Sequence, residues 1–273
     1  MKKTIVFATG NPHKLQELKG IAGDCGIDFV LPPEGFDPVE DGKTFEENSL
    51  IKAREAARVS GLPALADDSG LCVEALNGEP GIYSARYAET PQKRIDKLLK
   101  ELNEILRLKR HSERSEESHA LKPQNDEIER RAKFVCAMTL VSADGEIIFQ
   151  TIGECHGYIA KTQSGTNGFG YDPIFVPLTS PQPSPYKGKG AIVNEATPSC
   201  TNAGESSNKY NETSPLLQRY LVGEGTIVNE AIPSCTNAGE VRTMAELSED
   251  EKNKISHRGN ALRKVLEFIN NNK

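Results

Sequence analysis

Two adjacent carboxylates are the first candidates for chemistry in this 273-residue sequence, because Asp67 and Asp68 lie between small residues and are followed by Ser69-Gly70. Acidic side chains are rarely buried without a partner, so a pair in this setting predicts a strand end that opens on a polar site. Successive residues of a strand point to opposite faces, which gives Asp67 and Asp68 room for different tasks. The residues alone leave a second interpretation open, an acidic turn that bonds its own backbone.

A second candidate site lies near the N-terminus, where Thr9-Gly10-Asn11 follows the apolar run Thr4–Ala8. An amphipathic helix pattern begins next, with Asn11 suited to the cap, Pro12 to the first position and Lys14 in the first turn. A strand, a glycine turn and a helix start form a layout that binds anions, because the first helical N–H groups are free. An ordinary turn is the alternative, and the Walker A pattern is absent.

The next polar group surrounds a predicted helix that starts after Thr44 and runs to about Ser60. Glu40 precedes it as a further carboxylate. Asn48 and Lys52 are four residues apart, so they share one face of the helix. For Lys52 the alternative is a solvated face on which the side chain extends toward water.

Two later segments complete the set. Glycines around Phe169 and Tyr171 allow the backbone to approach a ligand, and an aromatic ring there can stack on a base, although a plain glycine-rich turn is also possible. His257 and Arg258 start the last predicted helix, where a cation is unfavourable unless it faces an anion or a polar ligand. Carboxylates for a hard cation, cations for phosphates and an aromatic for a base together indicate a metal-dependent nucleotide site.

Hydrophobic periodicity predicts the elements that must position these residues. Short apolar runs predict strands at residues 4–8, 27–31, from 63 onward, 132–141 and 147–151, followed by another hairpin-like run at 153–160. Amphipathic patterns predict helices that begin near residues 12, 45, 91, 249 and 257. The apolar stripe at residues 95–106 indicates core packing or a dimer contact.

Two segments lack this periodicity and predict insertions into one domain that spans residues 1–273. Residues 110–127 are rich in serine and glutamate, which predicts an exposed loop. Residues 178–240 are of low complexity and contain a repeat, since Ile192–Glu205 recurs as Ile227–Glu240 with one mismatch. Two copies are too few to stack a core, so the segment predicts a duplicated insertion in a domain of ordinary size.

Composition narrows the class of protein. The net charge of −6 argues against a general nucleic-acid binder, which is expected to carry a basic surface. No apolar segment is long enough to cross a membrane, and the apolar run after Met1 is too short for a signal peptide. The six cysteines show no metal-ligand spacing and predict reduced thiols. These features predict a cytoplasmic protein that binds neither nucleic acid nor membranes.

The ordered set of motifs resembles the inosine triphosphate pyrophosphatase family, whose members hydrolyse noncanonical purine nucleoside triphosphates (ITP, dITP and XTP) to the monophosphate and pyrophosphate. The resemblance rests on TGN…K, GxTFxEN, ADDSGL, GxPGIYSARY, GFGYDP and SHRG, which occur here in the family's order. It implies an α/β fold, with an elongated mixed β-sheet flanked by helices and two lobes that enclose a nucleotide cleft. It also implies a homodimer.

The resemblance further implies a role for each matching residue. Mg²⁺ would be held by Glu40 and Asp68, with Asp68 also the catalytic base and Asp67 its support. The triphosphate would be held by Thr9, Asn11, Lys14, Lys52 and Ser69. Phe169 would stack on the purine, and its edge would be read by Asp172, Lys252, His257 and Arg258. Gly10, Gly170 and Tyr171 complete the substrate-binding residues that the resemblance implies.

Two other functions stay open at this point. One is a nucleotide pyrophosphatase of the related Maf type, which would prefer dTTP and UTP. The other is a catalytically silent nucleotide-binding protein whose repeat-bearing arm recruits partners. The intact set of Glu40, Asp67 and Asp68 favours an enzyme. The residues do not indicate how guanine would be excluded.

Overall fold

The computed structural model describes residues 3–10, 12–116, 129–178 and 241–272. Almost all of the predicted insertion at 178–240, including its internal repeat, lies outside these residues, as do Asn11 and the C-terminal part of the segment 110–127. The predicted interruption of one domain by these two segments therefore stays a prediction.

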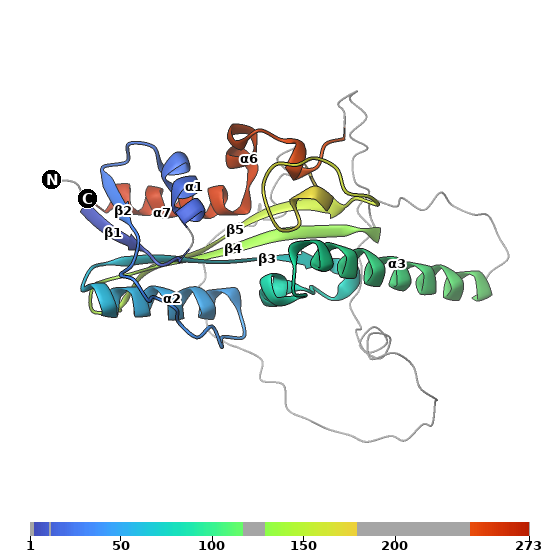
Figure 1. Ribbon diagram of the computed structural model, residues 1–273, viewed down its shortest axis with the longest axis horizontal. Helices are drawn as coiled ribbons and strands as arrows, with labels where there is room; N and C mark the ends of the chain where they lie inside the picture. The colour runs from blue at the N-terminus through green and yellow to red at the C-terminus, as the bar shows by residue number, and fades with distance from the viewer. Residues whose placement is uncertain (1–2, 11, 117–128, 179–240, 273) are drawn as a thin grey trace, which may run out of the picture. The chain divides into compact units, whose positions relative to one another are not determined.

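A six-stranded mixed sheet forms the centre of the described structure (Figure 1), in the order β2-β1-β3-β4-β5-β6. β1 pairs in parallel with β2 and β3, whereas the pairs from β3 to β6 are antiparallel. The strands are β1 Lys3–Phe7, β2 Ile27–Val30, β3 Ala64–Val73, β4 Arg131–Val141, β5 Ile147–Ile159 and β6 Phe175–Pro177. This arrangement confirms the predicted α/β fold with a mixed sheet and flanking helices.

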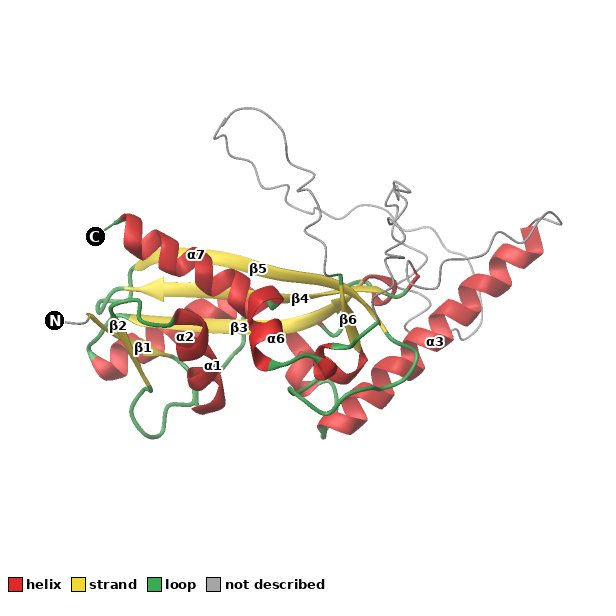
Figure 2. Ribbon diagram, turned by 90° about the horizontal axis from the view of Figure 1, so that it is seen from above, coloured by secondary structure: helices red, strands yellow, loops and turns green. Residues whose placement is uncertain are grey.

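The helices cover both faces of the sheet. They are α1 Pro12–Ala22, α2 Phe45–Ser60, α3 Pro91–Glu116, α6 Glu249–Ile255 and α7 His257–Asn271, with short 3-10 helices at Glu74–Leu76, Gly81–Arg86, Asp172–Ile174 and Met244–Glu246. α1 and α7 lie on one face and α2 on the other, and α7 runs along β5 (Figures 1 and 2). Within the described residues, no helix combines the length and the apolar character needed to cross a membrane.

Three apolar clusters fill the space between these layers. Leu18 of α1 and Leu262 of α7 pack with Phe7 and Met138 on one face, and the alanines of α2 pack on the other. The predicted stripe of α3 is core, because Leu98 and Leu102 are fully buried in a third cluster. A helix face that is buried in this way accounts for most of the helix's stability.

Local sequence explains where α2 begins and ends. The Thr44 side chain accepts a hydrogen bond from the Glu47 backbone N–H at 3.1 Å, and the Glu47 carboxylate accepts one from the Lys43 N–H at 2.6 Å. These bonds satisfy N–H groups that lack partners at a helix start. Gly61 ends the helix with a left-handed φ of 66°, which glycine adopts without strain.

Three predicted boundaries are wrong. β5 is one continuous strand, not two runs separated near Gly153, because that glycine lets the backbone of α7 approach and does not end the strand. Residues 110–116 continue α3 and are not a loop, since charged residues such as Arg and Glu favour helix even without an apolar stripe. Asp67 and Asp68 lie in the middle of β3, because its pairing with β4 continues through ten residues.

Candidate active site

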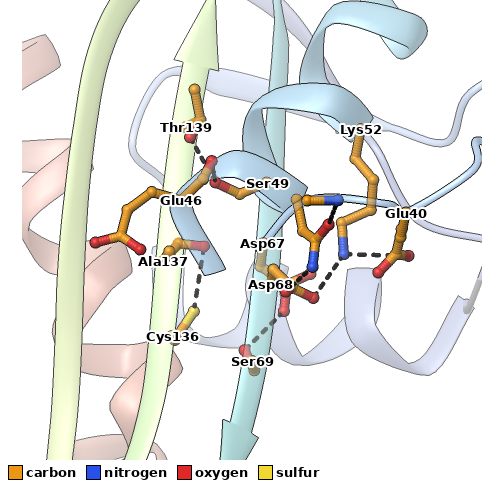
Figure 3. A network of polar contacts seen from close by, with 12 residues as sticks. Glu40, Glu46, Ser49, Lys52, Asp67, Asp68, Ser69, Cys136, Ala137 and Thr139 are labelled. Atoms are coloured by element: carbon orange, nitrogen blue, oxygen red, sulfur yellow. Dashed lines mark hydrogen bonds and ion pairs between the residues drawn. The ribbon is translucent and has the colours of Figure 1, made fainter. Parts of the chain in front are cut away.

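The two carboxylates of β3 point to opposite faces of the sheet, as strand alternation predicts. Asp67 faces α1 and α7, where its partners are Lys14 and Arg258. Asp68 faces α2, where its partners are Asn48 and Lys52 (Figure 3). β1 pairs with β3 only as far as Leu65, so the edge of β3 beside both carboxylates is free of that neighbour.

Asp67 anchors a buried ionic network. Its carboxylate accepts hydrogen bonds from Arg258 Nε at 3.0 Å, from Lys14 Nζ at 3.2 Å and from Ser69 Oγ at 3.3 Å. Burial acts to raise the pKa of Asp67, but the charges of Lys14 and Arg258 outweigh it and hold that pKa far below its usual range. Asp67 is therefore a fixed anion that positions two cations.

Arg258 is held from two sides. Besides Asp67, it donates from Nη1 to the Glu17 carboxylate at 2.6 Å, and only 2% of its side chain is exposed. Its Nη2 has no hydrogen-bond partner among the described residues. The guanidinium is thus oriented with one donor group left for a ligand.

On the α2 side, Lys52 lies between two carboxylates. Its Nζ contacts Asp68 Oδ1 at 3.0 Å and Glu40 Oε1 at 3.4 Å, while Asn48 donates to Asp68 at 3.2 Å (Figure 3). The lysine is buried, so the alternative of a solvated face is wrong. Burial lowers the pKa of Lys52, but the carboxylates of Asp67, Asp68 and Glu40 together raise it above its usual value. Burial also raises the pKa of Asp68, although Lys52 opposes the shift.

A pocket with a cavity volume of about 170 Å³ opens on the other side of β3. It brings together predicted site residues from elements far apart in the sequence, namely Lys14, Ser69, Phe169, Gly170, Tyr171, Asp172, Lys252, His257 and Arg258. Thr9 is buried at the end of β1, and Gly10 follows it at the surface. The structure therefore brings most of the predicted residues into one pocket, with Glu40, Asn48, Lys52 and Asp68 across the strand.

Phe169 forms the exposed wall of this pocket, with 57% of its surface accessible. Lys252 Nζ lies 4.8 Å and Arg258 Cζ 5.9 Å from the ring centroid. The Asp172 carboxylate fixes this region, since it accepts from Lys252 Nζ at 2.7 Å and from the Phe169 N–H at 2.8 Å. Gly168 has a φ of +76°, and any side chain there would overlap Asp172. An aromatic face bordered by cations suits a purine ring.

His257 lies at the base of the pocket and stacks on Phe134 with ring centroids 4.9 Å apart. Its Nδ1 is buried and has no hydrogen-bond partner among the described residues. Burial lowers the pKa of His257 well below its usual value, and the charges of Arg258 and Lys252 add to this shift. Both effects favour the neutral form of the ring.

Sequence reasoning did not single out Glu17, Arg94 or Phe134, which line the pocket, whereas Ser84 and Ala85 belong to the motif GxPGIYSARY. A signal existed for Glu17, which follows Lys14 by three residues and so shares its helix face. Arg94, in contrast, belongs to an ordinary amphipathic pattern and carried no signal.

The residues beside Lys52 fit a hard divalent cation. Glu40 and Asp68 are carboxylates that contact the same ammonium group, and Asn48 adds an amide. The described residues contain no group of three or more His, Cys, Asp or Glu side chains that could hold a metal ion without other ligands. Mg²⁺ is commonly bound by one or two carboxylates together with substrate phosphates and water, so the two carboxylates are a suitable set.

The mixed sheet and the site on β3 are those of an α/β enzyme that acts on nucleoside phosphates. The chain belongs to the Ham1 family, whose model matches residues 5–184 and 235–268. A relative from Pectobacterium atrosepticum, named dITP/XTP pyrophosphatase, is 35% identical and is aligned over 98% of each chain. One from Nostoc sp. with the same name is 41% identical over 64% of this chain and 78% of its own.

Solved structures of the same family have the same fold. A HAM1 protein from Coxiella burnetii is 30% identical, with a TM-score of 0.61 over 98% of this chain and 99% of its own. The Staphylococcus aureus Ham1 protein is 31% identical, with a TM-score of 0.61 over 99% of this chain and all of its own. These similarities confirm the predicted family and fold, and the prediction that the chain is an enzyme of the nucleoside triphosphate pyrophosphatase class.

Proposed function

We propose that the chain hydrolyses the noncanonical purine nucleotides ITP, dITP and XTP to the nucleoside monophosphate and pyrophosphate, with Mg²⁺ as cofactor. The observation that carries the proposal is the position of Asp68 beside Lys52 and Glu40, directly across β3 from a pocket that suits a nucleoside. Phosphoanhydride hydrolysis needs neutralised phosphate charge, a positioned water and a base, and this edge of the strand offers groups for each.

In this proposal Glu40 and Asp68 hold Mg²⁺, which neutralises phosphate charge when bound. Asp68 takes the proton of the attacking water, since a carboxylate positioned beside the phosphates is able to act as the base. Asp67 keeps Lys14 and Arg258 in place. The triphosphate is held by Thr9, Gly10, Lys14, Lys52 and Ser69, together with Asn11, which lies outside the described residues.

The base is proposed to stack on Phe169, in a site completed by Gly170 and Tyr171, with Asp172, Lys252, His257 and Arg258 at its edge. The free Nη2 of Arg258 is a donor, so it suits the C6 keto oxygen of hypoxanthine or xanthine. The amine at C6 of adenine would place donor against donor, a mismatch of roughly 1–3 kcal/mol.

Pyrophosphate release from a panel of nucleotides, with and without Mg²⁺, tests this proposal. The expected result is Mg²⁺-dependent release from ITP, dITP and XTP that exceeds release from ATP at least tenfold in kcat/KM. Preferred hydrolysis of dTTP and UTP would indicate a Maf-type activity instead. Binding of ITP without any release would indicate a silent nucleotide-binding protein.

On the family resemblance we further propose a cytoplasmic homodimer that binds neither nucleic acid nor membranes. Light scattering at micromolar concentration tests the dimer, and a monomeric mass would contradict it. We also propose that residues 178–240 form a loop insertion, since loop-closure entropy grows slowly with length. Replacing residues 179–239 with a short linker should leave ITP hydrolysis within tenfold, provided that the variant is folded.

A further inference from the structure

The nucleotide pocket is lined by two lysines and two arginines, and one of these four side chains differs from the rest in its partners. Three are neutralised by carboxylates at 2.6–3.2 Å, in the pairs Lys14–Asp67, Lys252–Asp172, Arg258–Glu17 and Arg258–Asp67. The fourth is Arg94, in the first turns of α3, whose side chain makes one hydrogen bond, from Nε to the Ala88 carbonyl oxygen at 3.2 Å. Among the described residues, no carboxylate pairs with it.

Arg94 lines the pocket but takes no part in the ionic network around Asp67. It lies close enough to Tyr171 for its charge to act on the phenol, and Tyr171 donates from its hydroxyl to the Ser84 carbonyl oxygen at 3.1 Å. Ser84, Leu71 and Phe134 line the pocket with it. The cations proposed for the triphosphate, Lys14 and Lys52, instead contact the aspartates of β3.

A purely structural role would leave most of this side chain unused. The Ala88 bond needs only Nε, whereas a guanidinium presents five N–H donors in a fixed fork. Lys97, one turn later on α3, makes a comparable bond from Nζ to the Tyr87 carbonyl oxygen at 3.1 Å, yet it does not line the pocket. On the same helix, Lys97 contacts the loop and does not line the pocket, whereas Arg94 contacts the loop and also lines the pocket.

We propose that Arg94 is a further substrate-binding residue, whose Nη1 and Nη2 groups donate hydrogen bonds to the nucleoside part of the nucleotide. This inference rests on the proposed function, because it takes the bound ligand to be a purine nucleotide. The pocket that Arg94 lines also contains the aromatic and apolar side chains of Tyr171, Phe134 and Leu71, which favours the nucleoside over the phosphate chain. Arg94 is assigned to binding and takes no part in proton transfer.

The first test compares Arg94→Gln and Arg94→Lys in ITP hydrolysis. A lost charge-assisted hydrogen bond at a partly exposed position raises KM roughly tenfold. A group that binds substrate and transition state equally leaves kcat within about threefold. Arg94→Lys should fall between wild type and Arg94→Gln, because lysine keeps the charge and loses the fork.

Product inhibition separates the two halves of the substrate. For Arg94→Gln, the inhibition constant of IMP should rise about tenfold, and that of pyrophosphate should stay within twofold. Lys97→Gln is the matched control, expected to leave both constants within twofold of wild type. Far-UV circular dichroism and the melting temperature establish that each variant is folded.

Three outcomes would overturn the proposal. An IMP constant that does not change in Arg94→Gln excludes a contact with the nucleoside. A change in the pyrophosphate constant alone assigns Arg94 to the phosphates. An equal rise of the IMP inhibition constant in Lys97→Gln would show that the effect comes from the hydrogen bonds that hold the loop at Tyr87 and Ala88. Calorimetric titration of IMP into each variant measures the same contact without turnover. If the wild-type chain failed to hydrolyse ITP, the proposed function would be refuted, and the affinities for IMP would still test the role of Arg94.

Discussion

Replacing Asp67 with asparagine should destabilise the fold, because it removes the anion from a buried ionic network. The substitution keeps the shape of the side chain and leaves Arg258, which is 2% exposed, with Glu17 as its remaining carboxylate. The amide is neutral, so it no longer balances the charges of Lys14 and Arg258, and its NH2 group replaces one of the two oxygens that accept from Lys14. Breaking a buried ion pair from one side typically costs 3–5 kcal/mol.

For Asp67→Asn we expect a loss of stability at the lower end of this range, about 3 kcal/mol. The loss is limited because Arg258 keeps its ion pair with Glu17 and the Lys14 side chain is partly exposed to water. With an m-value near 2 kcal/mol/M, this lowers the urea midpoint by ~1.5 M, measured by far-UV circular dichroism. Glu154→Gln is the matched control, since its pair with Lys133 is more than one-third exposed on both sides and should contribute under ~1 kcal/mol. Equal midpoints for wild type and Asp67→Asn would refute the reasoning.

The same network makes a prediction about pH. The pKa of Asp67 is lower in the folded chain than the ordinary value of ~3.9 in the unfolded chain. Its stabilising effect is therefore fully present above that ordinary pKa and is lost as pH falls toward the folded value. The difference in stability between wild type and Asp67→Asn should be constant above about pH 5 and shrink by ~1.4 kcal/mol per pH unit below ~3.9.

Three further predictions concern single residues. Asp68→Asn should lower kcat for ITP at least ~100-fold in a chain that stays folded, measured by pyrophosphate release, and unchanged turnover would contradict the assignment of the base. The pKa of His257 is lower in the folded chain, so the unfolded chain binds its proton first as pH falls below ~6.5. His257→Gln should thus reduce the loss of stability between pH 6.5 and 5, seen in urea midpoints; an identical pH dependence would contradict this. In Gly153→Ala the new methyl group would overlap the backbone of α7, which should cost about 1–3 kcal/mol, while Gly20→Ala on α1 has free space and should be neutral or slightly stabilising in thermal melts.

Features that depend on local backbone geometry were predictable from the sequence. The opposite directions of Asp67 and Asp68 follow from the period of a strand, and the structure confirms them. The same applies to the shared face of Asn48 and Lys52, since both contact Asp68. The start of α2 at its threonine cap was predictable because the cap residue satisfies free N–H groups of the first turn.

Features that depend on contacts between distant segments were not predictable in this way. Arg258 meets Asp67 across 191 positions of sequence, and no local pattern indicates that pairing. The burial of Lys52 has the same origin, because Glu40 and Asp68 reach it from two other segments. Gly153 led to the prediction of two separate strands for a related reason. The lack of a side chain at Gly153 is explained only by the close approach of the α7 backbone to β5.

The geometry of the sheet also explains why two neighbouring aspartates can serve different ends. Asp67 faces the helices that supply Lys14 and Arg258, so its charge is fully balanced and its pKa is strongly lowered. Asp68 faces α2, where burial raises its pKa against the effect of a single lysine. If both side chains lay on one face, they would share the same cations and repel each other, and one would gain a proton. Under the proposed function, the alternation of β3 leaves Asp67 to position the cations Lys14 and Arg258 and leaves Asp68 for the metal and the water.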